Sequence, residues 1–251
     1  MGKNSVSRRC LVTGLAVGSV GVVSTATADV AAAQSRPARF YTPTPIPVRD
    51  GKAALSPDQS LDLLRQGNSA FLDGQTPELD VGTVRRLELA QGQAPFVAYV
   101  SCSDSRVPPE LLFGRGLGEL FIIRNAGNTV DTVAMGSIEY AVAVLGVPLV
   151  VVMGHEACGA VKAAMAVVES NARFPGSIDD MLEPIIPAVL AARGAPGDKT
   201  EAAIKANVSR TVQRLRTEAD PIMLKPQRAG QLKIVGAYYS LSTGGVEFFD
   251  V

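Results

Sequence analysis

Two cysteines and one histidine carry the most distinctive chemistry in this chain. His155 and Cys158 are three residues apart, and Cys102 lies earlier in the sequence. The whole chain has three cysteines and one histidine, so only Cys10 stands outside this set. Two sulfurs and one imidazole nitrogen form a Cys₂His set, which binds zinc and leaves a fourth position for water or substrate. The alternative interpretation is that both cysteines are small buried hydrophobes and that the histidine is a hydrogen-bonded core residue.

A carboxylate and a guanidinium follow the first cysteine closely. Asp104 and Arg106 are two residues apart, which allows a bidentate ion pair across one turn. Taken alone, such a pair is usually a solvated surface contact of little energetic value. Beside a metal thiolate, Asp104 has two possible roles. It is either a fourth zinc ligand that closes the site, or an acceptor that Arg106 holds to orient a zinc-bound hydroxide.

The elements around these residues predict an α/β fold. Short apolar runs ending in polar or glycine-rich turns indicate buried strands, and the stretches between them have helical spacing. Strands that alternate with helices predict a mainly parallel sheet flanked by helices on both faces, and the last two strands form a C-terminal antiparallel hairpin at the sheet edge. The expected strands are 96–100, 120–123, 149–153, 233–239 and 246–249, and the expected helices are 57–72, 134–145 and 157–168.

The candidate ligands fall at the ends of two of these strands. Cys102 follows the strand 96–100, and His155 follows the strand 149–153 across a single glycine. Ligands of open α/β sheets bind outside the carboxyl ends of the strands, so we expect the two sites to meet there. If the segment from His155 to Cys158 is the first turn of a helix, both side chains share one face, and the helix N-terminus favours the thiolate of Cys158.

Composition excludes several classes of protein. The 24 Lys and Arg residues balance 24 Asp and Glu, which argues against a nucleic-acid binder that depends on surplus positive charge. Hydrophobic residues make up 47% of the chain, enough for a sizeable core. With three cysteines, a disulfide framework is not expected to support the fold.

The N-terminal residues resemble an export signal. Basic residues that include Arg8 and Arg9 precede an apolar run, and cleavage sites of the A-x-A type follow, so residues 1–33 are expected to be a signal peptide cut after Ala28 or Ala33. The arginine pair favours the twin-arginine route, with general secretion or an uncleaved anchor as alternatives. A proline-rich linker over 34–55 and a catalytic domain over 56–251 follow. The mature protein is therefore expected in the periplasm or outside the cell, without a membrane span.

The motifs C-x-D-x-R and H-x-x-C-G together resemble those of the β-class carbonic anhydrases, and the resemblance extends over about residues 57 to 251. It implies the fold described above and one Zn²⁺ per chain, held by Cys102, His155 and Cys158. It also implies that Asp104 and Arg106 are the catalytic pair, with Asp104 as the fourth ligand in a closed form. The matching segments are Gln93, 102–108, 118–121, 124–128, 137–142, 154–160 and the hairpin with 236–239 and 243–244.

The resemblance also implies a substrate pocket and an activity. The pocket residues that it implies are Gln93, Phe121, Ala126, Tyr140 and Gly159. Gln93 favours the plant-like branch of the family, and the lack of Trp in the chain argues against a second, regulatory bicarbonate site. The activity is that of a lyase, the reversible hydration of CO₂ to bicarbonate and a proton by zinc-bound hydroxide. Hydrolysis of COS or CS₂ on the same scaffold, or a non-catalytic zinc protein, are the alternatives, and a homodimer or larger homo-oligomer is expected.

Overall fold

Five strands form the central sheet, and all of them were expected from the apolar runs. The computed structural model describes residues 38–217 and 220–250, so the expected signal peptide lies outside the described residues. The strand order is β6-β5-β7-β8-β9, with every pair parallel except the terminal β8-β9 hairpin. The strands are β5 (Val97–Cys102), β6 (Leu120–Asn125), β7 (Leu149–His155), β8 (Lys233–Tyr239) and β9 (Val246–Phe249).

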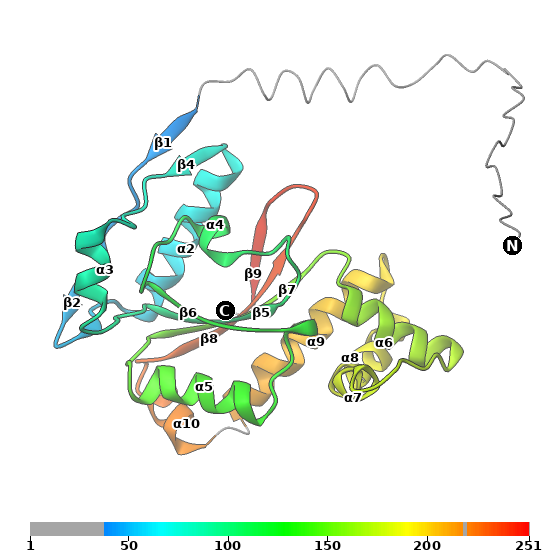
Figure 1. Ribbon diagram of the computed structural model, residues 1–251. Coiled ribbons are helices and arrows are strands. Elements are labelled where there is room, and N and C mark those ends of the chain that lie inside the picture. The colour runs from blue at the N-terminus through cyan, green and yellow to red at the C-terminus, as the bar shows by residue number, and fades with distance from the viewer. Residues whose placement is uncertain (1–37, 218–219, 251) are drawn as a thin grey trace, which may run out of the picture. The chain divides into compact units, whose positions relative to one another are not determined.

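Helices cover both faces of this sheet (Figure 1). In the view of Figure 1, α2 and α4 lie above the sheet, whereas α5, α9 and α10 lie below it. The helices are α2 (Pro57–Leu72), α3 (Thr83–Leu89), α4 (Pro109–Phe113), α5 (Thr132–Ala143), α6 (Gly159–Ser170), α7 (Ile178–Leu182), α8 (Ile186–Ala191), α9 (Lys199–Thr217) and α10 (Pro221–Arg228), with 3₁₀ turns η1 (Ala126–Asn128), η2 (Glu183–Ile185) and η3 (Ala192–Gly194).

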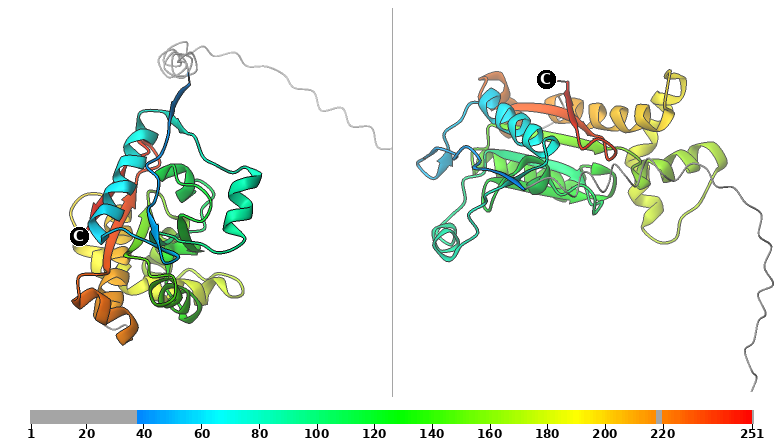
Figure 2. Two further views of the ribbon diagram at one scale, coloured as in Figure 1. Left: turned by 90° about the vertical axis from the view of Figure 1, so that its left-hand side faces the viewer. Right: turned by 90° about the horizontal axis from the view of Figure 1, so that it is seen from above.

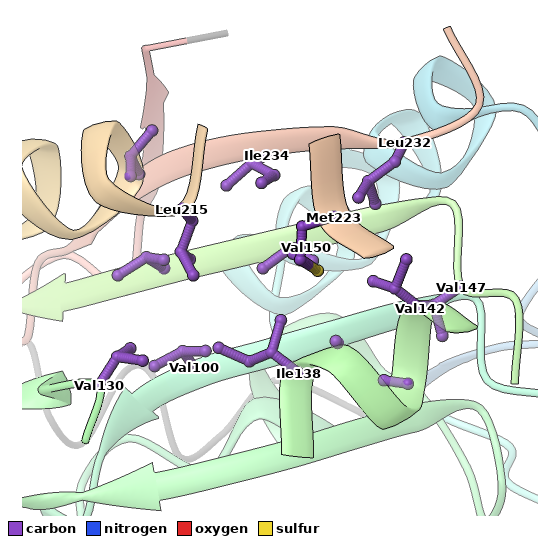
Figure 3. Close-up of a cluster of buried hydrophobic side chains, with 14 of the residues drawn as sticks. Val100, Val130, Ile138, Val142, Val147, Val150, Leu215, Met223, Leu232 and Ile234 are labelled. Atoms are coloured by element: carbon purple, nitrogen blue, oxygen red, sulfur yellow. The ribbon is translucent and has the colours of Figure 1, made fainter. Parts of the chain in front are cut away.

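Alternate side chains of the central strands enter two different cores. In β5, Tyr99 packs on the side of α2, and its neighbours Ala98 and Val100 pack on the side of α5 and α10. Figure 3 shows this second core, in which Val100 and Val150 from the strands meet side chains of α5, α9 and α10. Because both faces of β5 and β7 are covered, these two strands are buried at every position and are mostly apolar, which explains why they appear in the sequence as continuous apolar runs.

The N-terminal part of the described chain runs extended against the domain. Three short strands, β1 (Arg39–Tyr41), β2 (Val48–Arg49) and β3 (Lys52–Ala53), lie in the segment expected as a linker, and β1 pairs with β4 (Gln75–Pro77). The buried Arg115 donates to the carbonyl of Thr44 at 2.9 Å, which fastens this segment. Among residues 38–217 and 220–250, no helix has the length and apolar composition needed to cross a bilayer.

The connections diverge between β5 and β7, which makes this the switch point of the sheet. From β5 the chain passes to β6 on one side, and from β7 it passes to β8 on the other side. Such a reversal of direction opens a space at the carboxyl ends of the two strands, where ligands of doubly wound sheets bind. Helices α6, α7 and α8 lie at this edge of the sheet (Figures 1 and 2).

Candidate metal centre

Three side chains lie together at the carboxyl ends of β5 and β7. They are Cys102, His155 and Cys158, here called the ligand cluster. Their ligand atoms all lie within 4.8 Å of one another, and all three residues are buried. Both cysteines are free thiols. Because β5 and β7 are neighbouring parallel strands, their last residues are side by side, which places the first cysteine next to the histidine.

The histidine ends its strand and is fixed in one orientation. The Nδ1 atom of His155 lies 2.9 Å from the carbonyl oxygen of Glu156. A carbonyl only accepts, so Nδ1 carries the proton and the lone pair of Nε2 faces the cluster. This Nε2 atom is buried and has no hydrogen-bond partner among the described residues. A metal ion would satisfy it.

The segment between the histidine and the second cysteine is a tight turn and not the helical turn expected from the sequence. His155 is the last residue of β7, and α6 begins only at Gly159, directly after Cys158. Ala157 adopts a left-handed backbone with φ of 56°, which reverses the chain between the two ligands. The expectation of a shared helical face was therefore wrong, although Cys158 does lie at the N-terminus of a helix.

Glu156 ties this turn to the C-terminal hairpin. Its carboxylate accepts hydrogen bonds from the hydroxyl of Ser240 at 3.0 Å and from the amide and hydroxyl of Ser242 at 3.0 and 3.1 Å. These bonds lower the pKa of Glu156, and the bond from the amide of Ser242 makes the largest contribution. Its own amide donates to the carbonyl of Tyr239 at 2.8 Å. The sequence pattern gave Glu156 no role, and its partners lie far along the chain.

The two thiols titrate as a coupled pair. A hydrogen bond from Cys158 lowers the pKa of the Cys102 thiol to about 4, with further contributions from His155 and from the amide of Gly127. The same hydrogen bond, together with burial, raises the pKa of the Cys158 thiol. One thiolate therefore forms readily, and a divalent cation displaces the remaining proton when it binds.

Asp104 and Arg106 form the bidentate pair that their spacing allows. Arg106 donates from Nε to Oδ1 of Asp104 at 2.9 Å and from its terminal nitrogen to Oδ2 at 2.7 Å. These hydrogen bonds hold the pKa of Asp104 well below its usual range. Oδ2 lies 3.9 Å from Nε2 of His155. The carboxylate thus stands beside the ligand cluster but is bound to Arg106.

A second arginine supports the loop that carries this pair. Arg124, on β6, donates from Nε to the carbonyl of Cys102 at 2.9 Å and from its terminal nitrogen to the carbonyl of Asp104 at 2.6 Å. These two bonds fix the backbone on both sides of Ser103. The sequence gave no sign of this role, because the contact depends on the pairing of β5 with β6.

The five expected pocket residues fall into two groups. Ala126 begins the turn η1 beside Cys102, and Gly159 directly follows Cys158, so both lie next to the ligand cluster. Phe121 pairs with Ala98, far along the sheet from the carboxyl edge.

The other three of the five lie away from the cluster of their own chain. The ring of Phe121 lies 6.1 Å from that of Tyr140, whose side chain is exposed. Gln93 is also exposed and precedes β5, at the end of the strand opposite Cys102. A single chain therefore does not bring these three residues to the ligand cluster.

The fold and this cluster define an α/β protein with a Cys₂His side-chain set that could hold a metal ion at the switch point of a parallel sheet. A family model described as carbonic anhydrase matches residues 97–246. The chain is 40% identical over 184 residues to a carbonic anhydrase of Mycolicibacterium smegmatis, covering 73% of this chain and 89% of the relative. It is 38% identical over 181 residues to carbonic anhydrase 2 of Mycobacterium tuberculosis, covering 72% and 87%. The chain belongs to the carbonic anhydrase family.

A solved structure gives the class within that family. One of two tetrameric β-carbonic anhydrases from Sordaria macrospora superposes with a TM-score of 0.59 at 28% identity, covering 66% of this chain and 86% of that one. The parallel sheet with its terminal hairpin is the architecture of this class, and the chain is a member of the β class.

Proposed function

We propose that this chain catalyses the zinc-dependent, reversible hydration of CO₂ to bicarbonate and a proton. The observation that carries the proposal is the ligand cluster with its unpartnered, buried histidine nitrogen beside an arginine-held carboxylate. Two sulfurs and an imidazole are the donor types that zinc prefers, and three protein ligands leave one position for a reactant. No feature of the site favours COS or CS₂ hydrolysis or a non-catalytic role.

The residues around the cluster have distinct tasks in this reaction. Cys102, His155 and Cys158 would hold the zinc ion, which would supply the Lewis acidity that makes water nucleophilic near neutral pH. Asp104 stays ionised because Arg106 lowers its pKa, so its oxygen beside the cluster accepts a hydrogen bond and orients the attacking water. This orientation leaves a lone pair of the water free to face CO₂.

The proton produced in the reaction must leave without a histidine shuttle. His155 is the one histidine of the chain, and its two nitrogens are used by the metal centre and by the carbonyl of Glu156. Asp104 is a weak base because its pKa is lowered, and Tyr140 lies away from the ligand cluster of its own chain, so an external buffer serves as the acceptor. This requirement makes turnover depend on the buffer.

The first test compares CO₂ hydration by stopped flow with zinc content in the wild type and in Cys158→Ala. We expect an active wild type with about one zinc per chain and a variant that lacks both. Cys10→Ala in the full-length chain is the matched cysteine control and should retain both, since Cys10 lies in the expected signal peptide. Stoichiometric zinc without hydration activity would contradict the proposal and direct attention to other substrates.

We infer further that a second copy of the chain completes the substrate pocket. Gln93, Phe121 and Tyr140 lie away from the cluster of their own chain, and the first and last of these are exposed. The relative from Sordaria macrospora is described as tetrameric. A homodimer or larger homo-oligomer allows these side chains to serve a neighbouring site.

Mixing two defective chains tests this arrangement. Gln93→Ala keeps the ligand cluster, and Cys158→Ala keeps Gln93, so a mixed oligomer contains some sites with both. Co-expression should restore activity above that of either variant alone. Equal activity in the mixed and separate preparations would contradict a shared pocket.

We also propose that the chain is exported by a twin-arginine signal and acts in the periplasm or outside the cell. The support is the sequence of residues 1–33 with its arginine pair. Export of a folded protein allows zinc to be loaded before the two thiols meet an oxidising compartment. Replacing Arg8 and Arg9 with lysines should trap the protein in the cytoplasm, as measured by cell fractionation. Unchanged export would contradict the twin-arginine route.

A further inference from the structure

One polar side chain interrupts the buried face of α9. The buried positions of this helix recur with helical spacing and are otherwise apolar, among them Ile204 and Val208 on either side of Asn207. Asn207 is 3% exposed. Burial of an amide without a hydrogen bond is costly, so such a residue on an apolar face needs a specific partner.

The partner is a residue that touches the ligand cluster. The side-chain amide of Asn207 donates to the carbonyl oxygen of Gly127 at 3.0 Å. The backbone amide of Gly127 in turn donates to Sγ of Cys102 at 3.4 Å. Both bonds are buried, and they join residues that are far apart in the sequence.

The geometry of Gly127 explains why it needs support. Its backbone is left-handed, with φ of 75°, and it lies within the short turn η1. A left-handed glycine is not held by side-chain contacts of its own, so its carbonyl and amide are oriented by what they bind. Anchoring the carbonyl to α9 restricts rotation about the Cα atom and keeps the neighbouring amide directed at the sulfur.

We propose that Asn207 is a positioning residue of the metal centre, which acts on the thiolate of Cys102 through the backbone of Gly127. This role depends on the proposed zinc site, whose occupancy it would tune. A hydrogen bond from an amide to a metal thiolate withdraws charge from the sulfur and fixes its orientation. Without Asn207, the amide of Gly127 is less firmly directed at the sulfur, and the site binds its metal less tightly.

The test uses cobalt(II) as the metal, because its thiolate charge-transfer absorption reports the charge on sulfur. The variants are Asn207→Ala, which deletes the donor, and Asn207→Leu, which keeps the approximate shape but has no donor. Both should move the charge-transfer band to longer wavelength and lower metal affinity in chelator competition by roughly 10-fold.

A buried asparagine elsewhere provides the matched control. Asn68 on α2 is also buried and donates to the carbonyl of a glycine, Gly244, at 3.0 Å. Neither of these two residues belongs to the ligand cluster. Asn68→Ala should therefore lower the melting temperature without moving the cobalt band or the metal affinity.

The outcomes separate this proposal from the proposed function. A wild type that takes up no cobalt with a charge-transfer band contradicts the metal centre itself. If the wild type has a normal band, and the band is unchanged in the Asn207 variants as it is in Asn68→Ala, only the role of Asn207 is overturned.

A second measurement does not require that the variants fold. In wild-type protein labelled with ¹⁵N-glycine and loaded with ¹¹³Cd, a scalar coupling between cadmium and the amide proton of Gly127 is expected across the N–H···S bond. Absence of this coupling also overturns the proposal, because Asn207 then has no route to the sulfur.

Discussion

Replacing Gly127 with alanine tests how tightly the turn beside Cys102 is packed. A methyl group on Gly127 would lie 2.5 Å from Cδ1 of Ile185 and 3.1 Å from Cβ of Ala160. The left-handed backbone costs a residue with a Cβ atom roughly 1–2 kcal/mol. Overpacking against a buried neighbour costs a further ~1–3 kcal/mol. We therefore expect Gly127→Ala to lower the free energy of unfolding by about 2–5 kcal/mol in total.

A second substitution separates the two contributions. Ile185→Val removes Cδ1, after which the nearest remaining atom of that side chain is Cγ1 at 3.6 Å, an ordinary contact. Ile185→Val alone should cost roughly 0.5–1.5 kcal/mol. In the double variant the clash with Ile185 is relieved, whereas the backbone cost and the 3.1 Å approach to Ala160 remain, so its destabilisation should be smaller than the sum of the singles by about 1–3 kcal/mol.

The assay is urea unfolding of wild type, both single variants and the double variant at fixed zinc and protein concentration, since ligand binding and oligomerisation alter apparent stability. Single-variant losses that add to within roughly 0.5 kcal/mol would show that Ile185 does not oppose the new methyl group, and would refute the steric reasoning. A Gly127→Ala variant as stable as wild type would refute the backbone argument as well.

Four further predictions concern catalysis and stability. Arg106→Gln should keep zinc but lower kcat/KM for CO₂ by roughly 10- to 100-fold, because Asp104 loses the partner that orients it and lowers its pKa. Arg124→Gln should lower kcat/KM by roughly 10-fold, and Arg124→Lys should not restore it, because one ammonium group does not reproduce the two directed bonds of the guanidinium. Asp198 accepts hydrogen bonds from the first amides of α9, which lowers its pKa. Its stabilising effect is therefore present at neutral pH and is lost as the pH falls through its folded-state pKa. The melting temperatures of wild type and Asp198→Asn should therefore converge in acid. Finally, turnover should rise with buffer concentration at fixed pH and ionic strength, since His155 is unavailable as a shuttle.

Each of these predictions has an opposing result. Loss of zinc from Arg106→Gln would assign that residue to metal retention. Full activity in Arg124→Lys would mean that charge alone, without the two directed bonds, supports the loop. A stability difference between wild type and Asp198→Asn that persists in strong acid would exclude titration of this cap. Turnover independent of buffer would require an internal proton acceptor.

The sequence was sufficient for much of the fold. The apolar runs located all five strands of the main sheet because strands covered on both faces, such as β5 and β7, are mostly apolar along their length. The helix expected over 57–72 is α2, which begins with a capping box between Ser56 and Gln59. Strand ends shifted by a residue or two, since β5 and β7 extend as far as the ligands Cys102 and His155.

The sequence also determined which side chains meet at the metal centre, because the described chain offers few soft ligands and two strand ends carry them. Only the tertiary structure decided how they are held. The turn at Ala157, the bonds of Arg124 and the support from Asn207 depend on contacts between segments distant in sequence, which local periodicity does not encode. In the sequence, Asn207 is distinguished only as a polar residue on an apolar helical face. Its partner is defined only when α9 packs against η1.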